Sequence, residues 1–199
     1  LDEAEFLWGV WEHSLVAPNY TLDEVAEGPE ARLMAHIDGL VVNGPQVARR
    51  LLIPALEDDE PGRVSAAATA LLLGPGSEAG FAAVLEALRE LPAQRAPLVR
   101  ALGCAEVQWL LPRMRALLSD VDTSIVAAAA EVLAFHFEPL AETHGLLLAS
   151  EDSRERVLSL RALPHEPDAR RYIRAIEAGL RDDAPNIVDA AIDSGVQLG

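Results

Sequence analysis

The feature that most constrains this chain of 199 residues is an internal repeat with a period of 31 residues. Val126, Val157 and Val188 are each separated by 31 residues, and each is followed three positions later by an apolar residue. Acidic residues lie in the short turn before each valine. A repeat of this length holds two short helices, which bury their apolar faces only against neighbouring repeats. The period therefore predicts an all-α protein built as an α-α superhelix.

The segment from Val107 to Phe137 shows one repeat in full. Its first half spaces apolar residues as one face of a helix does, polar residues 120–124 interrupt the pattern, and a second helix is expected from near Ile125. The 34 alanines, 31 leucines and 5% aromatic residues suit helices packed closely in pairs. Val64 and Val99 mark earlier repeats, so we expect about five helix pairs between residues 44 and 199.

These repeats resemble HEAT repeats, in which a proline kinks the first helix, an aspartate closes the turn and a valine opens the second helix. Pro112, Asp120 and Val126 follow that pattern, and residues 51–58 with Val64 repeat it. The arginine that often follows the valine is found only at Arg100. The resemblance implies a HEAT-like solenoid whose concave side, lined by second helices, binds other proteins.

Residues 1–43 differ from the repeats and are expected to form a helical cap. A helix is predicted over residues 5–13, then a turn with a capping box from Thr21 to Glu24, then a helix that ends at Gly39 or Gly44. This block resembles the N-terminal block of uncharacterised bacterial HEAT-repeat proteins, some encoded beside type VI secretion genes. The resemblance implies secretion-apparatus or effector proteins as partners. Because a helical pattern runs to the last residues, we expect the repeats to continue in a longer protein.

The charge of the chain argues against nucleic acid and membrane surfaces as partners. There are 32 acidic residues and 16 basic ones, all arginine, for a net charge of −16, which repels phosphate and anionic lipid. Residues 1–60 hold 13 acidic and 3 basic residues and could steer a basic partner. Cys104, the single cysteine, cannot form an intramolecular disulfide, and no apolar run reaches the roughly 20 residues of a membrane span. We therefore expect a cytoplasmic protein.

The sequence offers few groups with catalytic or metal-binding chemistry. His136, Glu138, Glu142 and His144 form the cluster most like a metal site, but Pro139 separates the histidines, so a solvated turn is expected there. The HEAT-like deoxyhypusine hydroxylases use several His-Glu pairs, whereas the chain has one, His165-Glu166.

Two further segments receive structural assignments. Cys104 is interpreted as a small core residue, and residues 74–77 as a turn between repeats, because that loop has no lysine of the kind that binds phosphate. We expect no cofactor.

Protein binding is the remaining function, and candidate contact residues can be named. Leu7, Trp11 and Leu15 share one helical stripe that is expected to be core, which leaves Trp8 as an exposed contact. The other candidates are arginines on or near second helices: Arg63, Arg100, Arg154, Arg156 and Arg161. The predicted function is that of a non-catalytic scaffold or adaptor for protein–protein interaction. The alternative is a HEAT-like enzyme of the lyase type or of the metal-dependent hydroxylase type.

Overall fold

A computed structural model describes residues 1–74 and 77–199. The secondary structure of these residues is helical, with no β-strand, so the protein is all-α as predicted. Contacts divide the chain into two compact units, unit 1 over residues 1–110 and unit 2 over residues 111–199. Helix α8 (Val107–Leu117) contains the boundary between them. The division predicted at residue 43 stays a prediction.

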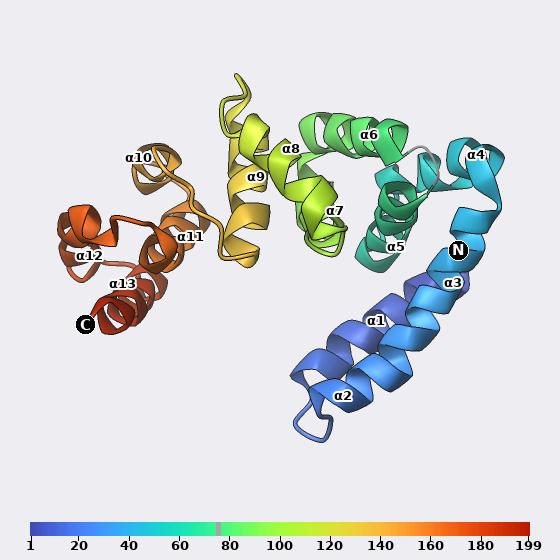
Figure 1. The fold of residues 1–199 in the computed structure, drawn as a ribbon, viewed down its shortest axis with the longest axis horizontal. Coiled ribbons are helices and arrows are strands. Elements are labelled where there is room, and N and C mark those ends of the chain that lie inside the picture. The colour runs from blue at the N-terminus through green and yellow to red at the C-terminus, as the bar shows by residue number, and fades with distance from the viewer. Residues whose placement is uncertain (75–76) are drawn as a thin grey trace. The chain divides into compact units, whose positions relative to one another are not determined.

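Unit 1 alternates long helices with short helical segments (Figure 1). Its elements in chain order are α1 (Asp2–Val16), α2 (Leu22–Val25), the π-helical η1 (Ala26–Glu30), α3 (Ala31–Val42), α4 (Gly44–Val47), the π-helical η2 (Ala48–Leu52), the 3-10 helix η3 (Pro54–Glu57), α5 (Pro61–Leu73), α6 (Ser77–Glu90), the 3-10 helix η4 (Pro92–Gln94) and α7 (Arg95–Gly103).

Helix α5 forms the centre of unit 1 because it packs against α1, α3, α6 and α7. Every residue from Val64 to Leu72 is buried. Four of these residues are alanines, whose small side chains let several helices approach the same helix closely. The buried Ser65 hydroxyl donates a hydrogen bond to the Pro97 carbonyl at 3.1 Å, which links α5 to the start of α7. The second helices of consecutive predicted repeats are therefore neighbours within this unit.

The predicted capping box at the N-terminal turn is confirmed. The Thr21 hydroxyl accepts from the Glu24 backbone N–H, and the Glu24 carboxylate accepts from the Thr21 N–H at 2.8 Å. The helix after it runs without a break through α2, η1 and α3 to Val42, passing Gly39. Gly44 then adopts φ of +72°, a left-handed conformation that glycine reaches without a Cβ clash. Of the two predicted ends, the one at Gly44 is therefore the one observed.

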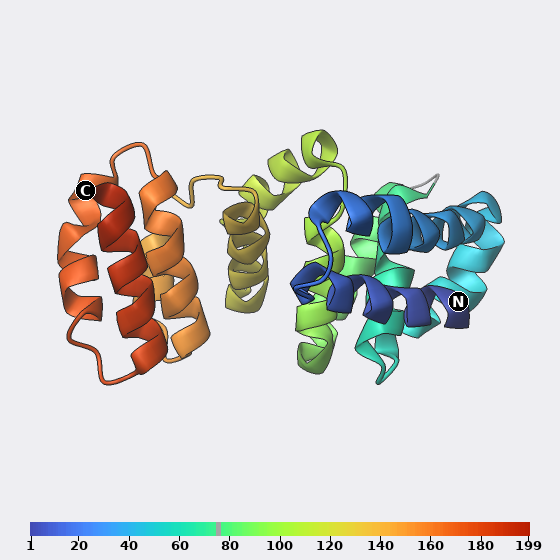
Figure 2. The ribbon, with the colours of Figure 1, turned by 90° about the horizontal axis from the view of Figure 1, so that it is seen from below.

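Unit 2 contains shorter helices joined by longer turns. After α8 come α9 (Thr123–Phe135), α10 (Thr143–Leu148), α11 (Ser153–Ala162), the 3-10 helices η5 (Leu163–His165) and η6 (Ala169–Tyr172), α12 (Ile173–Gly179) and α13 (Pro185–Leu198). Helix α11 contacts α9, α10, α12 and α13, and both views show α11 beside α13 (Figures 1 and 2). Their core includes Leu160, Leu163, Ile176 and Ile187.

The repeat pattern places its marker residues as expected. Val64, Val99, Val126, Val157 and Val188 lie on α5, α7, α9, α11 and α13, the second helices of the predicted pairs. The apolar residues three positions later are all buried, at 0–1% exposure. The acidic turns act as caps: Asp122 accepts from the Ser124 N–H at 2.9 Å and Asp152 from the Arg154 N–H at 2.8 Å.

The structure bears to different extents on the predictions about membrane spans and about the turn at residues 74–77. No helix among the described residues combines the length and the apolar character needed to cross a bilayer. Of the turn predicted at residues 74–77, Pro75 and Gly76 lie outside the described residues.

Candidate functional site

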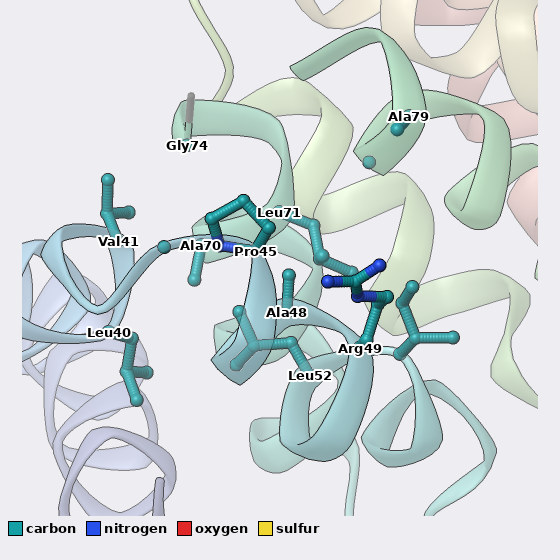
Figure 3. Close-up of a pocket in the computed structure, with 13 residues that line it drawn as sticks. Leu40, Val41, Pro45, Ala48, Arg49, Leu52, Ala70, Leu71, Gly74 and Ala79 are labelled. Atoms are coloured by element: carbon teal, nitrogen blue, oxygen red, sulfur yellow. The ribbon is translucent and has the colours of Figure 1, made fainter. Parts of the chain in front are cut away.

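An apolar cavity of about 270 Å³ lies in unit 1, where the turn after α3 meets α5 and α6 (Figure 3). Its walls come from α3, η2 and α5, through Leu40, Val41, Ala48, Leu52, Ala70 and Leu71. Pro45 and Ala79 also line it. The volume is just below the lower end of the range of about 300–1,000 Å³ typical of drug-sized ligands. The cavity therefore suits a small ligand or a single large side chain.

Glycines set the shape of this cavity. Gly44 turns the chain between α3 and α4 in its left-handed conformation. Gly80 lets α6 approach α5 closely, because a Cβ at position 80 would lie 2.2 Å from the Leu71 carbonyl oxygen. Such a distance is far below van der Waals contact, so only glycine allows this helix crossing.

Arg49 is the single charged side chain among the described residues that line the cavity. It lies on the π-helical η2, is exposed, and points its guanidinium toward the middle of the lining side chains (Figure 3). Within the described part of the chain, no carboxylate pairs with it, whereas Arg63, Arg100 and Arg115 are all ion-paired. The cavity thus combines apolar walls with one available cation.

Unit 2 contains a buried polar chain of Ser159, His144 and Glu166. His144 on α10 is fully buried, with Nδ1 2.8 Å from Ser159 Oγ on α11 and Nε2 3.0 Å from Glu166 Oε1. A carboxylate only accepts hydrogen bonds, so Nε2 carries the proton and donates to it. In the neutral ring Nδ1 then accepts from the Ser159 hydroxyl.

Burial keeps this histidine neutral. Burial lowers the pKa of His144 below its ordinary value, against the hydrogen bond and negative charge of Glu166, which raise it. The positive charge of Arg171 lowers the pKa further. The ring therefore serves as a neutral link between a hydroxyl and a carboxylate.

Glu166 also holds the loop that precedes α10. Its Oε1 accepts from the backbone N–H groups of Leu140, at 2.6 Å, and Ala141, at 3.0 Å. Ala141 adopts φ of +50°, an uncommon conformation for a residue with a Cβ. The Tyr172 hydroxyl donates to the Ala141 carbonyl at 3.0 Å. The carboxylate and the tyrosine thus stabilise a strained backbone conformation.

The Ser-His-carboxylate order has the composition of a nucleophilic triad, but its surroundings do not allow that chemistry. Ser159 and His144 are both 0% exposed, so a substrate cannot reach the hydroxyl. Ser159 Oγ, the two ring nitrogens of His144 and Glu166 Oε1 join α10, α11 and the segment after η5. The arrangement is structural.

Comparison with protein-family models and with curated protein sequences finds no match for this chain.

The prediction that Trp8 is an exposed contact is wrong. Trp8 is 2% exposed and packs edge-on against Trp11, with ring centroids 5.2 Å apart, while Leu15 of the predicted core stripe is 39% exposed. Helix α1 contacts both α3 and α5, so it buries two sides rather than one stripe. A prediction based on a single buried face therefore misplaces Trp8.

The predicted arginine contacts in unit 1 are engaged within the chain. The guanidinium of Arg63 lies 2.6 Å from the carboxylate of Asp2, 2.8 Å from that of Glu5 and 3.4 Å from that of Asp58. The hydrogen bond from Arg63 and its positive charge lower the pKa of Asp2. Arg100 lies 3.2 Å from Glu12. Part of the acidic N-terminal charge is thus paired internally, with arginines of α5 and α7.

The predicted arginine contacts in unit 2 all lie on α11. Arg156 is half-buried and donates to the carbonyls of Ser150 and Glu151, at 2.6 and 3.0 Å. Arg154 and Arg161 are exposed. Whether any of these arginines binds a partner stays a prediction.

The histidine region and the cysteine differ from their predicted settings. No three His, Cys, Asp or Glu side chains in residues 1–74 and 77–199 are placed to hold a metal ion. Glu138 pairs with Arg115, and His144 is core rather than part of a solvated turn. Cys104, expected in the core, is exposed at the end of α7. Partial burial of its thiol still raises its pKa, an effect that Arg100 opposes.

Sequence reasoning missed both the cavity and the role of Glu166. His165-Glu166 stood out only as an isolated pair between prolines, and the hydrogen-bond partners of Glu166 lie 22, 25 and 26 residues away in the sequence. Arg49 is one of two adjacent arginines, and no local pattern separates it from Arg50.

Proposed function

We propose that this chain is a non-catalytic scaffold of the HEAT-like helical-repeat kind, which binds another protein through the cavity of unit 1. The observation that carries the proposal is an open, apolar cavity with one available cation. Apolar side chains next in sequence to the lining residues are also exposed: Val42 at 84%, Leu51 at 39% and Leu73 at 37%. A concave apolar site and exposed apolar side chains are both typical of places where proteins bind one another.

Two features support a scaffold rather than an enzyme. The chain of groups with the composition of a catalytic triad is closed to solvent, so it supports stability. Within each unit, second helices of consecutive repeats pack side by side, α5 with α7 and α11 with α9 and α13, as stacked repeats do. In line with the resemblance to bacterial HEAT-repeat proteins, the proposed partners are secretion-apparatus or effector proteins in the cytoplasm.

The proposal is tested by site-specific photo-crosslinking with the chain expressed in its native cells. Benzoylphenylalanine is placed at Ala79, which lines the cavity, and in a second variant at Ala82, which is exposed on the same helix and does not line it. We expect a covalent protein adduct from position 79 that position 82 does not give. No adduct at position 79, or the same adducts at both positions, contradicts protein binding at this cavity.

A further inference from the structure

The cavity and Arg49 together restrict what can bind there. Liquid water occupies about 30 Å³ per molecule, and an engineered apolar cavity of about 150 Å³ binds benzene. A space of about 270 Å³ therefore accepts one large aliphatic or aromatic group with some room for its attachment. The rest of any larger ligand must lie outside.

The cation adds a second requirement. A guanidinium presents a planar set of donors that matches a carboxylate, with two parallel hydrogen bonds. Arg49 points toward the cavity and has no carboxylate partner in the described residues, so the site is ready to accept an anion (Figure 3). The apolar group and the anion must be close together, because both fit one small cavity.

We propose that the cavity binds the C-terminal residue of a partner protein, with its apolar side chain inside and its α-carboxylate on Arg49. This inference rests on the proposed function and specifies the partner segment. A chain terminus carries an apolar side chain and a carboxylate on one residue. An internal leucine or phenylalanine brings no anion, and an internal aspartate or glutamate leaves the apolar walls without a group to bury, at a cost of about 25 cal/mol for each Å².

The test measures binding of fluorescein-labelled hexapeptides of alternating glycine and serine that end in leucine or phenylalanine. Each is made with a free C-terminal carboxylate and as the C-terminal amide, and fluorescence anisotropy is followed with the full chain. We expect the free acid to bind about 10- to 100-fold more tightly than the amide, the value of a charge-assisted hydrogen bond. Arg49→Gln removes this preference.

Arg50→Gln is the matched control, because Arg50 is adjacent, exposed and outside the cavity lining. It keeps the preference for the free acid within about twofold, since an exposed charge that makes no hydrogen bond to the bound carboxylate contributes little. Retained far-UV circular dichroism in both variants shows that the helices are intact.

Three outcomes overturn the proposal. Equal affinity for the free acid and the amide shows that the carboxylate has no role. An equal loss of the preference for the free acid in Arg49→Gln and Arg50→Gln shows that Arg49 has no specific role. Binding of octanoate, measured by calorimetry, without binding of either peptide assigns the cavity to a free apolar acid. If neither peptide binds but the photo-crosslink from position 79 still forms, the cavity binds a protein, and the proposal that it binds a C-terminal residue is wrong.

Discussion

The buried carboxylate of Glu166 provides the most direct test of how unit 2 is stabilised. Glu166→Ala removes one oxygen that accepts hydrogen bonds from the N–H groups of Leu140 and Ala141 and from Nε2 of His144. Glu142→Ala is the control, because Glu142 precedes α10 directly, and its side chain is 93% exposed with one ion pair to Arg171.

The expected loss arises from the donors left behind. A buried donor without a partner costs about 1–3 kcal/mol, and three donors lose their acceptor. Water that enters the vacated space recovers part of this, so we expect the free energy of unfolding to fall by about 3–5 kcal/mol. That is a large share of the roughly 5–15 kcal/mol of a typical domain. The control changes stability much less, because an exposed ion pair contributes little.

Urea unfolding followed by far-UV circular dichroism measures the free energy, and amide hydrogen exchange by NMR locates the effect. The Leu140 and Ala141 amides, which are bonded to Glu166, are expected to exchange much faster in Glu166→Ala and unchanged in Glu142→Ala. The reasoning is refuted if Glu166→Ala is no less stable than the control, or if these two amides keep their protection.

Two other predictions concern the packing of α6 and the titration of unit 2. Gly80→Ala is expected to lower the free energy of unfolding by about 1–3 kcal/mol, because its Cβ would lie 2.2 Å from the Leu71 carbonyl oxygen. The control Gly9→Ala, whose Cβ would meet no atom within 4 Å, is expected to raise the free energy of unfolding by up to about 1 kcal/mol. Thermal unfolding measures both variants, and a Gly80→Ala variant more stable than the parent would contradict the close crossing of α5 and α6. The lowered pKa of His144 means that the unfolded chain binds more protons than the folded chain as the pH falls below the ordinary value of about 6.5. Stability therefore falls as the pH drops below about 6.5, by at most about 1.4 kcal/mol per pH unit. Urea unfolding across this range should show a smaller slope in His144→Gln, and an unchanged slope would assign the pH dependence to other groups.

Burial was predicted less well than helix position, for a physical reason. The Thr21 capping box and the Asp122 and Asp152 caps involve residues two or three positions apart, so their sequence spacing is enough to find them. The burial of Trp8 and the exposure of Cys104 depend on which helices lie against α1 and on how the chain packs at the end of α7. Sequence spacing on one helix does not report how many neighbours that helix has.

The sequence by itself determined the all-α class and the positions of the helices that carry Val64, Val99, Val126, Val157 and Val188, because periodicity and capping act over short distances. Only the tertiary structure decided where chemistry could occur. It buried Ser159 and His144 beside Glu166, and it left the Arg49 guanidinium over an apolar cavity closed on one side by Gly80. Those arrangements join residues far apart in the sequence, and packing of whole helices, rather than any local pattern, brings them together.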